Sequence, residues 1–354
     1  MVNEVKKSSP GLQAEAEKSR YNSLDGLRAY SAIGIIMMHV LVNGQYALGG
    51  FVFNELIVSF TDLVYLFMAI SGFSMCCGYY DKIVNGQIDL GKFYSKRFAK
   101  VWPFFAVLCV MDFAVSPSVN TLYELIADLT LCFGLIPNAN ISVIGVGWFL
   151  GVAFVFYYTF PFFCSLLSDK KRAWLAFGVT FLLNLLCKLY FDVTRASIAF
   201  SAVYFMIGGM IYLYREALRK FAERFGWAVL LGVTAFLVLY YLLGRNTLVA
   251  IPVCALILIW AIRPQRRTTT VLSNSVTKML SGISMEIYLC HMLVYRVLEK
   301  LKLVNLFPSP LLSFAVAFVG TLAGAIVMSL VINRALSWLT VAFQRIRKNS
   351  VGCR

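Results

Sequence analysis

The sequence has few charged residues, very few histidines and no clustered metal-ligand motif. Only 14% of the 354 residues are charged and 60% are apolar, against roughly 45–50% apolar in soluble domains. This composition excludes an ordinary soluble globular domain. The nine cysteines show no Cys-x-x-Cys or Cys/His spacing. We therefore interpret them as free thiols that act as small hydrophobic residues, and we expect no metal site.

Long apolar runs account for most of the chain. The first twenty residues are polar and lack the apolar core of a cleavable signal peptide, so the first run is predicted to be an uncleaved anchor. A helix needs about 20 apolar residues to cross a bilayer. Runs of this kind lie at 27–46, 56–79, 98–115, 142–167, 173–191, 197–214, 227–243, 247–262, 280–298 and 311–333. The predicted fold class is therefore an all-α polytopic membrane protein of about ten transmembrane helices. The segment 119–136 is interrupted by Glu124 and Asp128, and it is interpreted as interfacial or re-entrant.

The net charge of +15 could indicate nucleic-acid binding, but its distribution favours a membrane. If the N-terminus is cytoplasmic, all but six of the 32 lysines and arginines fall on the cytoplasmic side. The six exceptions are Lys188, Arg195, Arg245, Arg296, Lys300 and Lys302. This asymmetry follows the positive-inside rule. It predicts cytoplasmic N- and C-termini, a location in the cell inner (plasma) membrane and contact with anionic lipids rather than nucleic acid. The predicted organisation is a polar tail (1–22), one membrane domain (23–340) and a basic tail (341–354).

Both histidines of the chain fall inside predicted spans. His39 lies about 12 residues into the first span and His291 about 11 into the ninth, so each is expected near the bilayer midplane. Ionisable groups at this depth are costly and are candidates for function. The alternative for each is a histidine that only packs. Their matching depth favours function.

The first predicted helix places a cation and a histidine on one face. Arg28 and His39 are eleven residues apart, which is about three helical turns and about 16 Å along the axis. A ligand with an anionic head and a reactive tail could extend between them, and coenzyme A has this shape. The alternative is a snorkelling arginine above a packing histidine.

The ninth predicted helix carries one polar stripe, formed by Ser284, Tyr288, His291 and Tyr295. Glu286 lies on another face, so a Glu–His dyad along this helix is not expected. Asp62 in the second span is the more plausible carboxylate to orient a histidine.

A basic cluster opens the third predicted span. Arg97 and Lys100 follow Lys96 and lie close on one flank of the helix. The cluster is either an ordinary positive-inside feature or a site for nucleotide phosphates, which an arginine can bind with two hydrogen bonds.

These segments together resemble the acyltransferase-3 family of integral membrane acyltransferases. The similarity covers nearly the whole chain in five ordered blocks. They are SLDGLRAYSAIGIIMMH (23–39), LFMAISGF (66–73), KRFAKVWPFF (96–105), WFLGVAFVFYYTFP (148–161) and SGISMEIYLCHMLV (281–294). Many members carry a Glu five residues after the Trp of the fourth block, where this chain has Ala153. A catalytic role for that carboxylate is therefore absent here.

The resemblance implies O-acyl transfer, most simply O-acetyl transfer, from cytoplasmic acetyl-CoA or another acyl-CoA. The acceptor would be a hydroxyl of a cell-surface glycan, glycolipid or related precursor. His39 and His291 are the expected catalytic residues, with His39 as general base or transient acyl carrier and His291 orienting the acceptor or stabilising the oxyanion.

The remaining site residues follow from the same interpretation. Arg28, Arg97 and Lys100 would bind the donor phosphates, and Tyr288, Trp148 and Asp62 are the candidate acceptor contacts. Gly72 is expected to serve close helix packing. The competing interpretation is a secondary transporter with midplane histidines. Transporters often contain internal repeats, whereas the Arg-x10-His pattern occurs only once in this chain, which counts against a transporter.

Overall fold

The computed structural model describes residues 21–115, 117–131, 133–135, 145–264 and 270–351, with side chains described as far as residue 342. These ranges are helical and contain no β-strand, only an isolated bridge between Thr270 and Ser273. The all-α prediction is therefore confirmed. The predicted tail 1–22 lies almost wholly outside the described residues, and so does the start of the run predicted at 142–167.

Most of the described residues belong to a series of helices. In chain order the longer ones are α2 (Ser23–Gly44), α4 (Leu63–Val84), α5 (Leu90–Val115), α6 (Val119–Thr130), α7 (Trp148–Leu167), α8 (Lys170–Leu189), α9 (Ile198–Leu213), α10 (Arg215–Arg224), α11 (Gly226–Leu242), α12 (Thr247–Ala261), α13 (Ser275–Gly282), α14 (Ser284–Lys300) and α15 (Pro310–Val351). A π-turn (Val52–Leu56), α3 (Ile57–Ser59) and a 3₁₀ turn (Phe60–Asp62) lead directly into α4.

Each of the ten predicted runs coincides with a helix, but not every helix has the length of a full span. Among the described residues, six helices are long and apolar enough to cross a membrane, or seven if α9 and α10, which bend by 81°, form one span. The apolar helices α11 and α12 are shorter, with 17 and 15 residues. The multi-pass helical architecture is confirmed, whereas the count of ten stays a prediction.

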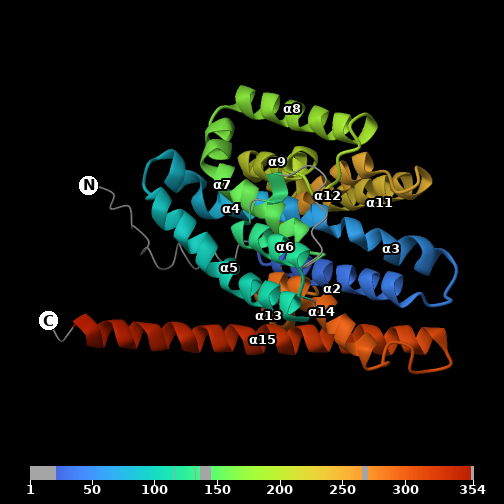
Figure 1. Cartoon of the computed structure of the whole chain (residues 1–354). Helices are drawn as coiled ribbons and strands as arrows, with labels where there is room; N and C mark the ends of the chain where they lie inside the picture. Colours follow the sequence, from blue (N-terminus) through green and yellow to red (C-terminus); the bar gives the residue numbers. More distant parts are fainter. Residues whose placement is uncertain (1–20, 116, 132, 136–144, 265–269, 352–354) are drawn as a thin grey trace.

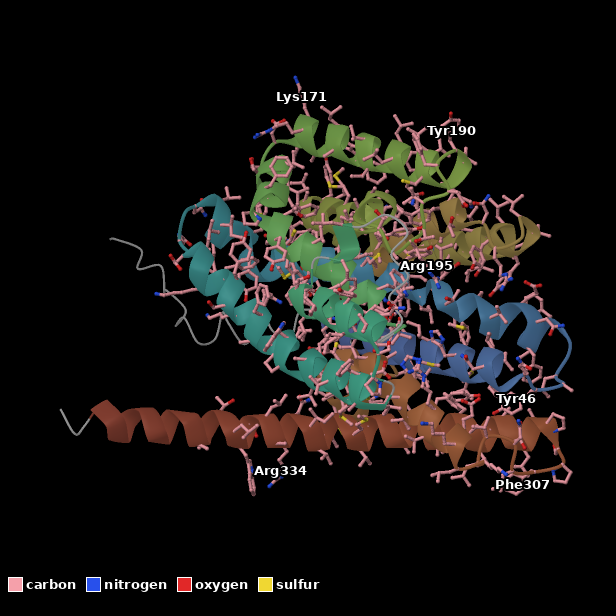
Figure 2. The ribbon with its side chains drawn as sticks, viewed as in Figure 1. Tyr46, Lys171, Tyr190, Arg195, Phe307 and Arg334 are labelled. Atoms are coloured by element: carbon pink, nitrogen blue, oxygen red, sulfur yellow. The ribbon has the colours of Figure 1, made fainter. Side chains whose placement is uncertain are left out.

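The helices form a bundle bounded by two exposed elements, α8 along one edge and α15 along the other (Figure 1). The 42 residues of α15 correspond to about 63 Å of helix, and its C-terminal part projects beyond the other helices. Figure 2 shows Lys171 and Arg334 toward that same end of the molecule, with Tyr46, Tyr190 and Phe307 toward the other. We call the first the basic end and the second the opposite end.

Glycines allow helices α4 and α9 to approach backbone to backbone. A Cβ atom on Gly72 would meet the carbonyl oxygen of Phe205, and one on Gly208 would meet that of Ala69. Small residues at such crossings are typical of packed membrane helices. The packing role predicted for Gly72 is confirmed, and this contact holds one wall of the site described next.

Candidate functional site

The two histidines lie against each other in the interior. Helices α2 and α14 are in contact, and the ring centroids of His39 and His291 are 5.1 Å apart. His291 is completely buried. The matching depth expected for these residues therefore corresponds to direct ring contact between two helices that are far apart in the sequence.

A backbone hydrogen bond fixes the tautomer of His291. Its Nδ1 lies 2.6 Å from the carbonyl oxygen of Tyr288, and a carbonyl can only accept, so Nδ1 carries the proton. Nε2 of the neutral ring then holds a lone pair. This atom is buried and has no hydrogen-bond partner among the described residues. His291 is thus arranged to accept a proton from a bound group.

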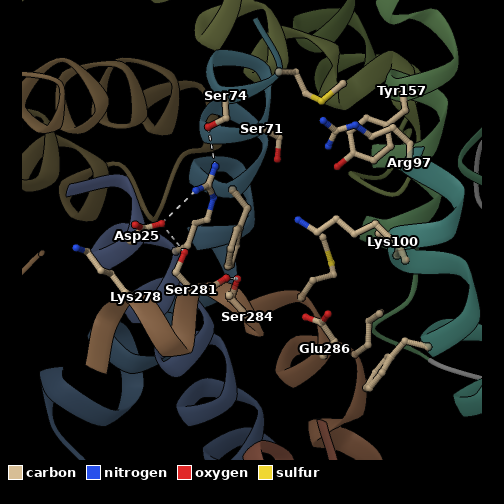
Figure 3. Close-up of a pocket in the computed structure, with 18 residues that line it drawn as sticks. Asp25, Ser71, Ser74, Arg97, Lys100, Tyr157, Lys278, Ser281, Ser284 and Glu286 are labelled. Carbon is tan, nitrogen blue, oxygen red and sulfur yellow. Dashed lines mark hydrogen bonds and ion pairs between the residues drawn. The ribbon is translucent and has the colours of Figure 1, made fainter. Parts of the chain in front are cut away.

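A cavity of about 420 Å³ opens at the basic end, where α2 and α14 begin. Its wall brings together all three predicted phosphate ligands, Arg28 from α2 and Arg97 and Lys100 from α5. Figure 3 shows Arg97 and Lys100 directed into the cavity from one side, across from Asp25 and Ser281. Lys278 of α13 adds a fourth cation to the lining. The cavity is therefore suited to an anionic ligand.

Arg28 is held rigidly by neighbouring polar groups. Its guanidinium donates to Ser74 Oγ at 2.6 Å and lies 3.7 Å from the carboxylate of Asp25. The hydroxyl of Ser281 donates to the same carboxylate at 2.9 Å. The backbone of Leu272 lies so close to Gly26 that a Cβ there would overlap it. This contact packs the turn before α13 onto α2 and keeps Ser281 beside Asp25.

Arg97 has a different environment. Its guanidinium lies over the rings of Tyr79 and Tyr157, 4.6 and 5.6 Å from their centroids. Its Nε is buried and has no hydrogen-bond partner within the described part of the chain. Aromatic faces hold a cation without neutralising its charge. Arg97 therefore keeps hydrogen-bonding capacity for an incoming anion.

Part of the wall of this cavity is apolar, and it includes a residue of the helix that carries His291. Phe67, Phe104 and Leu289 line it, and Leu289 precedes His291 by two residues. Glu286 also lines the cavity, on the same wall as Leu289.

Asp62 and Trp148 gather around a different residue, Arg195. Asp62 lies 3.4 Å from the guanidinium of Arg195 and accepts a 2.6 Å hydrogen bond from Tyr240. Trp148 packs over the same guanidinium at 5.1 Å. Asp62 and Trp148 therefore both contact Arg195, which lies in the connection before α9.

Tyr288 is committed to the protein backbone. Its hydroxyl donates to the carbonyl oxygen of Val146 at 2.8 Å, and its ring lies 6.0 Å from that of His291. The residue therefore positions the His291 ring through its own carbonyl and ring, while its hydroxyl is already bound.

Sequence reasoning did not single out Arg195, Lys278 or Tyr157 as site residues. Arg195 lies in the connection between α8 and α9, and Lys278 lies on the short helix α13, so no helical spacing relates either residue to the histidines. Tyr157 is one aromatic residue in an aromatic-rich run. Their only sequence signal is charge, and Arg195 is distinctive because it is one of the few cations predicted outside the basic side.

A family model described as an acyltransferase domain matches residues 21–330. No curated protein and no solved structure matches the chain. The matched range contains both histidines and every residue that lines the basic-end cavity. Within the described residues, no group of three or more His, Cys, Asp or Glu side chains is placed to hold a metal ion.

Proposed function

The chain belongs to the acyltransferase-3 family of integral membrane acyltransferases, and from this membership we propose that it moves an acyl group from acyl-CoA to an acceptor hydroxyl. Acetyl-CoA is the simplest donor, and a cell-surface glycan, glycolipid or related precursor is the acceptor class. The observation that carries the proposal is the contact between His39 and His291, on the two helices whose first turns line a cation-rich cavity.

We propose that the basic end faces the cytoplasm, with ten spans across the inner membrane. The four cations of the cavity wall at this end, together with Lys171 and Arg334, all belong to the side that the positive-inside rule assigns to the cytoplasm. Acyl-CoA is made and held in the cytoplasm, so a donor cavity that opens at this end is accessible to it. The apolar surfaces of α8 and α15 are the expected lipid contacts, because little of either helix is buried in the bundle.

The donor would bind with its phosphates on Arg28, Arg97 and Lys100. The pantetheine arm would then extend along the apolar part of the cavity toward His39, roughly 16 Å deeper along α2. Arg28 is oriented by Asp25 and Ser74 before the donor arrives, so little side-chain freedom is lost on binding.

The chemical step requires one proton acceptor beside the thioester. The acceptor oxygen attacks the thioester carbonyl, its proton passes to a histidine, and the carbon–sulfur bond breaks. The proton then leaves with the thiolate as free coenzyme A. Sequence reasoning assigned His39 the role of general base or transient acyl carrier, and the free Nε2 of His291 makes His291 equally suited to accept the proton.

The direct test is transfer by the purified protein in detergent, with labelled acetyl-CoA and extracted cell-envelope glycans. Label in the glycan fraction is expected without any sealed compartment. A secondary transporter would give none, because transport requires two separated compartments. Nothing in the family match favours the transporter.

A further inference from the structure

A second cavity opens at the opposite end of the same two helices. It has a volume of about 560 Å³, which falls within the usual range of ligand pockets, roughly 300–1,000 Å³. Its lining is mostly polar, with three amides, one hydroxyl, one carboxylate and one ammonium group. The lining residues are Asn43, Gly44, Gln45, Tyr295, Glu299, Lys302, Val304 and Asn305.

One buried hydroxyl in this lining lacks a partner. Tyr295 is 1% exposed, and its hydroxyl oxygen has no hydrogen-bond partner among the residues that the structure describes. A buried polar group left unsatisfied costs about 1–3 kcal/mol. Tyr295 lies one helical turn beyond His291 on α14, so a ligand that satisfies this hydroxyl would lie next to the histidine pair.

The walls of the cavity are fixed by contacts between its two loops. Asn43 lies one turn beyond His39 and donates to the His39 carbonyl oxygen at 2.7 Å. The hydroxyl of Tyr46 donates to the carbonyl oxygen of Val304 at 3.1 Å. The ring of Tyr46, located in Figure 2, packs so closely on Gly44 that a Cβ there would overlap it. The cavity is thus built from both histidine-bearing helices.

We propose that this cavity binds the acceptor, as a neutral polyhydroxyl compound of the sugar class, and that Tyr295 positions it. This inference rests on the function proposed above. Sugar hydroxyls both donate and accept hydrogen bonds, and the amide and hydroxyl groups of the lining do the same. Glu299 and Lys302 balance each other in charge, so the cavity has no excess of cations for a phosphate. Val304 is its single fully apolar side chain, so the lining offers little surface for an acyl chain.

The reaction then proceeds between two cavities. The acetyl group leaves the sulfur of coenzyme A on the basic side and forms an ester with a sugar oxygen on the opposite side. The hydroxyl proton passes through a histidine to the released thiol. The two substrates reach the histidine pair from opposite ends, so transfer depends on the side of the membrane on which each is supplied.

The test uses the full-length protein in sealed lipid vesicles, with labelled acetyl-CoA outside and maltose as the probe. Maltose is supplied either inside or outside. Acetylated maltose is expected only when maltose is inside, because the copies that bind external acetyl-CoA open their second cavity to the interior. Equal product with maltose only outside would overturn the inference while supporting the proposed function.

Variants locate the binding site. Tyr295→Phe should raise the KM for maltose about 3- to 10-fold, the range of one lost hydrogen bond, with acetyl-CoA binding unchanged. Lys302→Gln should also raise this KM. Its matched control is Lys300→Gln, since Lys300 lies two residues away and does not line the cavity. Equal KM values in all four proteins would overturn the assignment of Tyr295 and of the cavity.

A separate calorimetric titration of acetyl-CoA in detergent distinguishes the two proposals. If the wild type binds acetyl-CoA but acetylates maltose from neither side, the polyhydroxyl assignment is wrong and the donor site stands. If it neither binds acetyl-CoA nor transfers its acetyl group, the proposed function fails and the inference fails with it.

Discussion

The two cavities at the ends of α2 and α14 differ mainly in charge. The basic-end cavity has Arg28, Arg97, Lys100 and Lys278 in its wall, part of which is apolar. The opposite cavity has amides, a hydroxyl and one charge of each sign. The same helix pair thus presents a surface for an anion at one end and for a neutral polar group at the other. The histidines lie between them.

Because of this difference, the two ends would bind their ligands through different interactions. An anionic donor gains charge-assisted hydrogen bonds, which are about twice as strong as neutral ones. A neutral acceptor relies on several weaker hydrogen bonds and on a buried group such as Tyr295, which costs free energy when it is unpaired. Variants at the two ends should therefore change different kinetic constants, and variants at the centre should change the chemical step itself.

The largest expected effect comes from the centre. His39→Ala and His291→Ala should each lower kcat about 10²- to 10⁴-fold, the usual contribution of a positioned acid–base group. Because the histidines belong to neither cavity, the Kd for acetyl-CoA should stay within about twofold. The measurement is steady-state transfer together with a donor titration.

Folding is checked by the yield and the elution profile of each variant in detergent. The double variant tests whether the histidines act as a unit. If it is no slower than either single variant, they share one step. Near-normal kcat in His291→Ala would remove His291 from the chemistry, and the same result in His39→Ala would leave His291 as the sole base.

The extent to which this arrangement could be predicted depends on whether the residues share a helix. Periodicity placed Arg28 and His39 on one face and set the depth of His291, and the structure places the histidines in contact. Periodicity could not identify the partners of Asp62, because Arg195 and Tyr240 come from other segments and contact Asp62 only in the folded bundle. Periodicity likewise could not show that the Tyr288 hydroxyl binds the carbonyl of Val146, a partner 142 residues away.

The two cavities also differ in how far they could be predicted from the sequence. The three cations of the basic-end cavity were predicted because charge at the start of a span is visible in sequence. The opposite cavity was not, because single Asn, Gln and Tyr residues near helix ends are common and carry no such pattern. The number of full-length spans was also not predictable, because apolar composition alone did not reveal that α11 and α12 are short.

The next effect in size concerns the donor cavity. Arg97→Ala should weaken acetyl-CoA binding by about 1–3 kcal/mol, the value of a hydrogen bond to a charged group. Arg97→Lys should recover only part of this, because an ammonium lacks the planar fork. The acceptor KM should not change. Binding is measured by donor titration at several salt concentrations, and salt should weaken the wild type more than Arg97→Ala.

The matched control for this region is a pair of lysines one turn apart on α5. Lys100 lines the cavity and Lys96 does not, so Lys100→Ala should lower donor affinity and Lys96→Ala should leave it unchanged. Equal affinity in all of these proteins would mean that the cluster only satisfies the positive-inside rule. The donor would then bind elsewhere.

The smallest effect on transfer is expected from a buried carboxyl outside both cavities. Asp128 on α6 is fully buried, and its nearest polar partner in the described chain is Cys109, with Sγ 4.0 Å from Oδ2. Burial, followed by the charges of Glu124 and Asp112, raises the pKa of Asp128 to about 8. This carboxyl is therefore mostly protonated in the folded protein at neutral pH, and it lines neither cavity.

The sign of the pH dependence follows from this raised pKa. The unfolded chain has the ordinary value of about 3.9, so the contribution of Asp128 to stability is complete below pH 4 and is lost as the pH rises toward 8. Asp128→Asn should flatten this decline in thermal stability between about pH 5 and 8, with kcat and both substrate constants unchanged at pH 7. The measurement is the unfolding temperature in detergent across this range.

Identical pH profiles for wild type and variant would show that Asp128 ionises as freely in the folded protein as in the unfolded chain. A change in the Kd for acetyl-CoA or in the acceptor KM would instead show that α6 influences one of the two cavities.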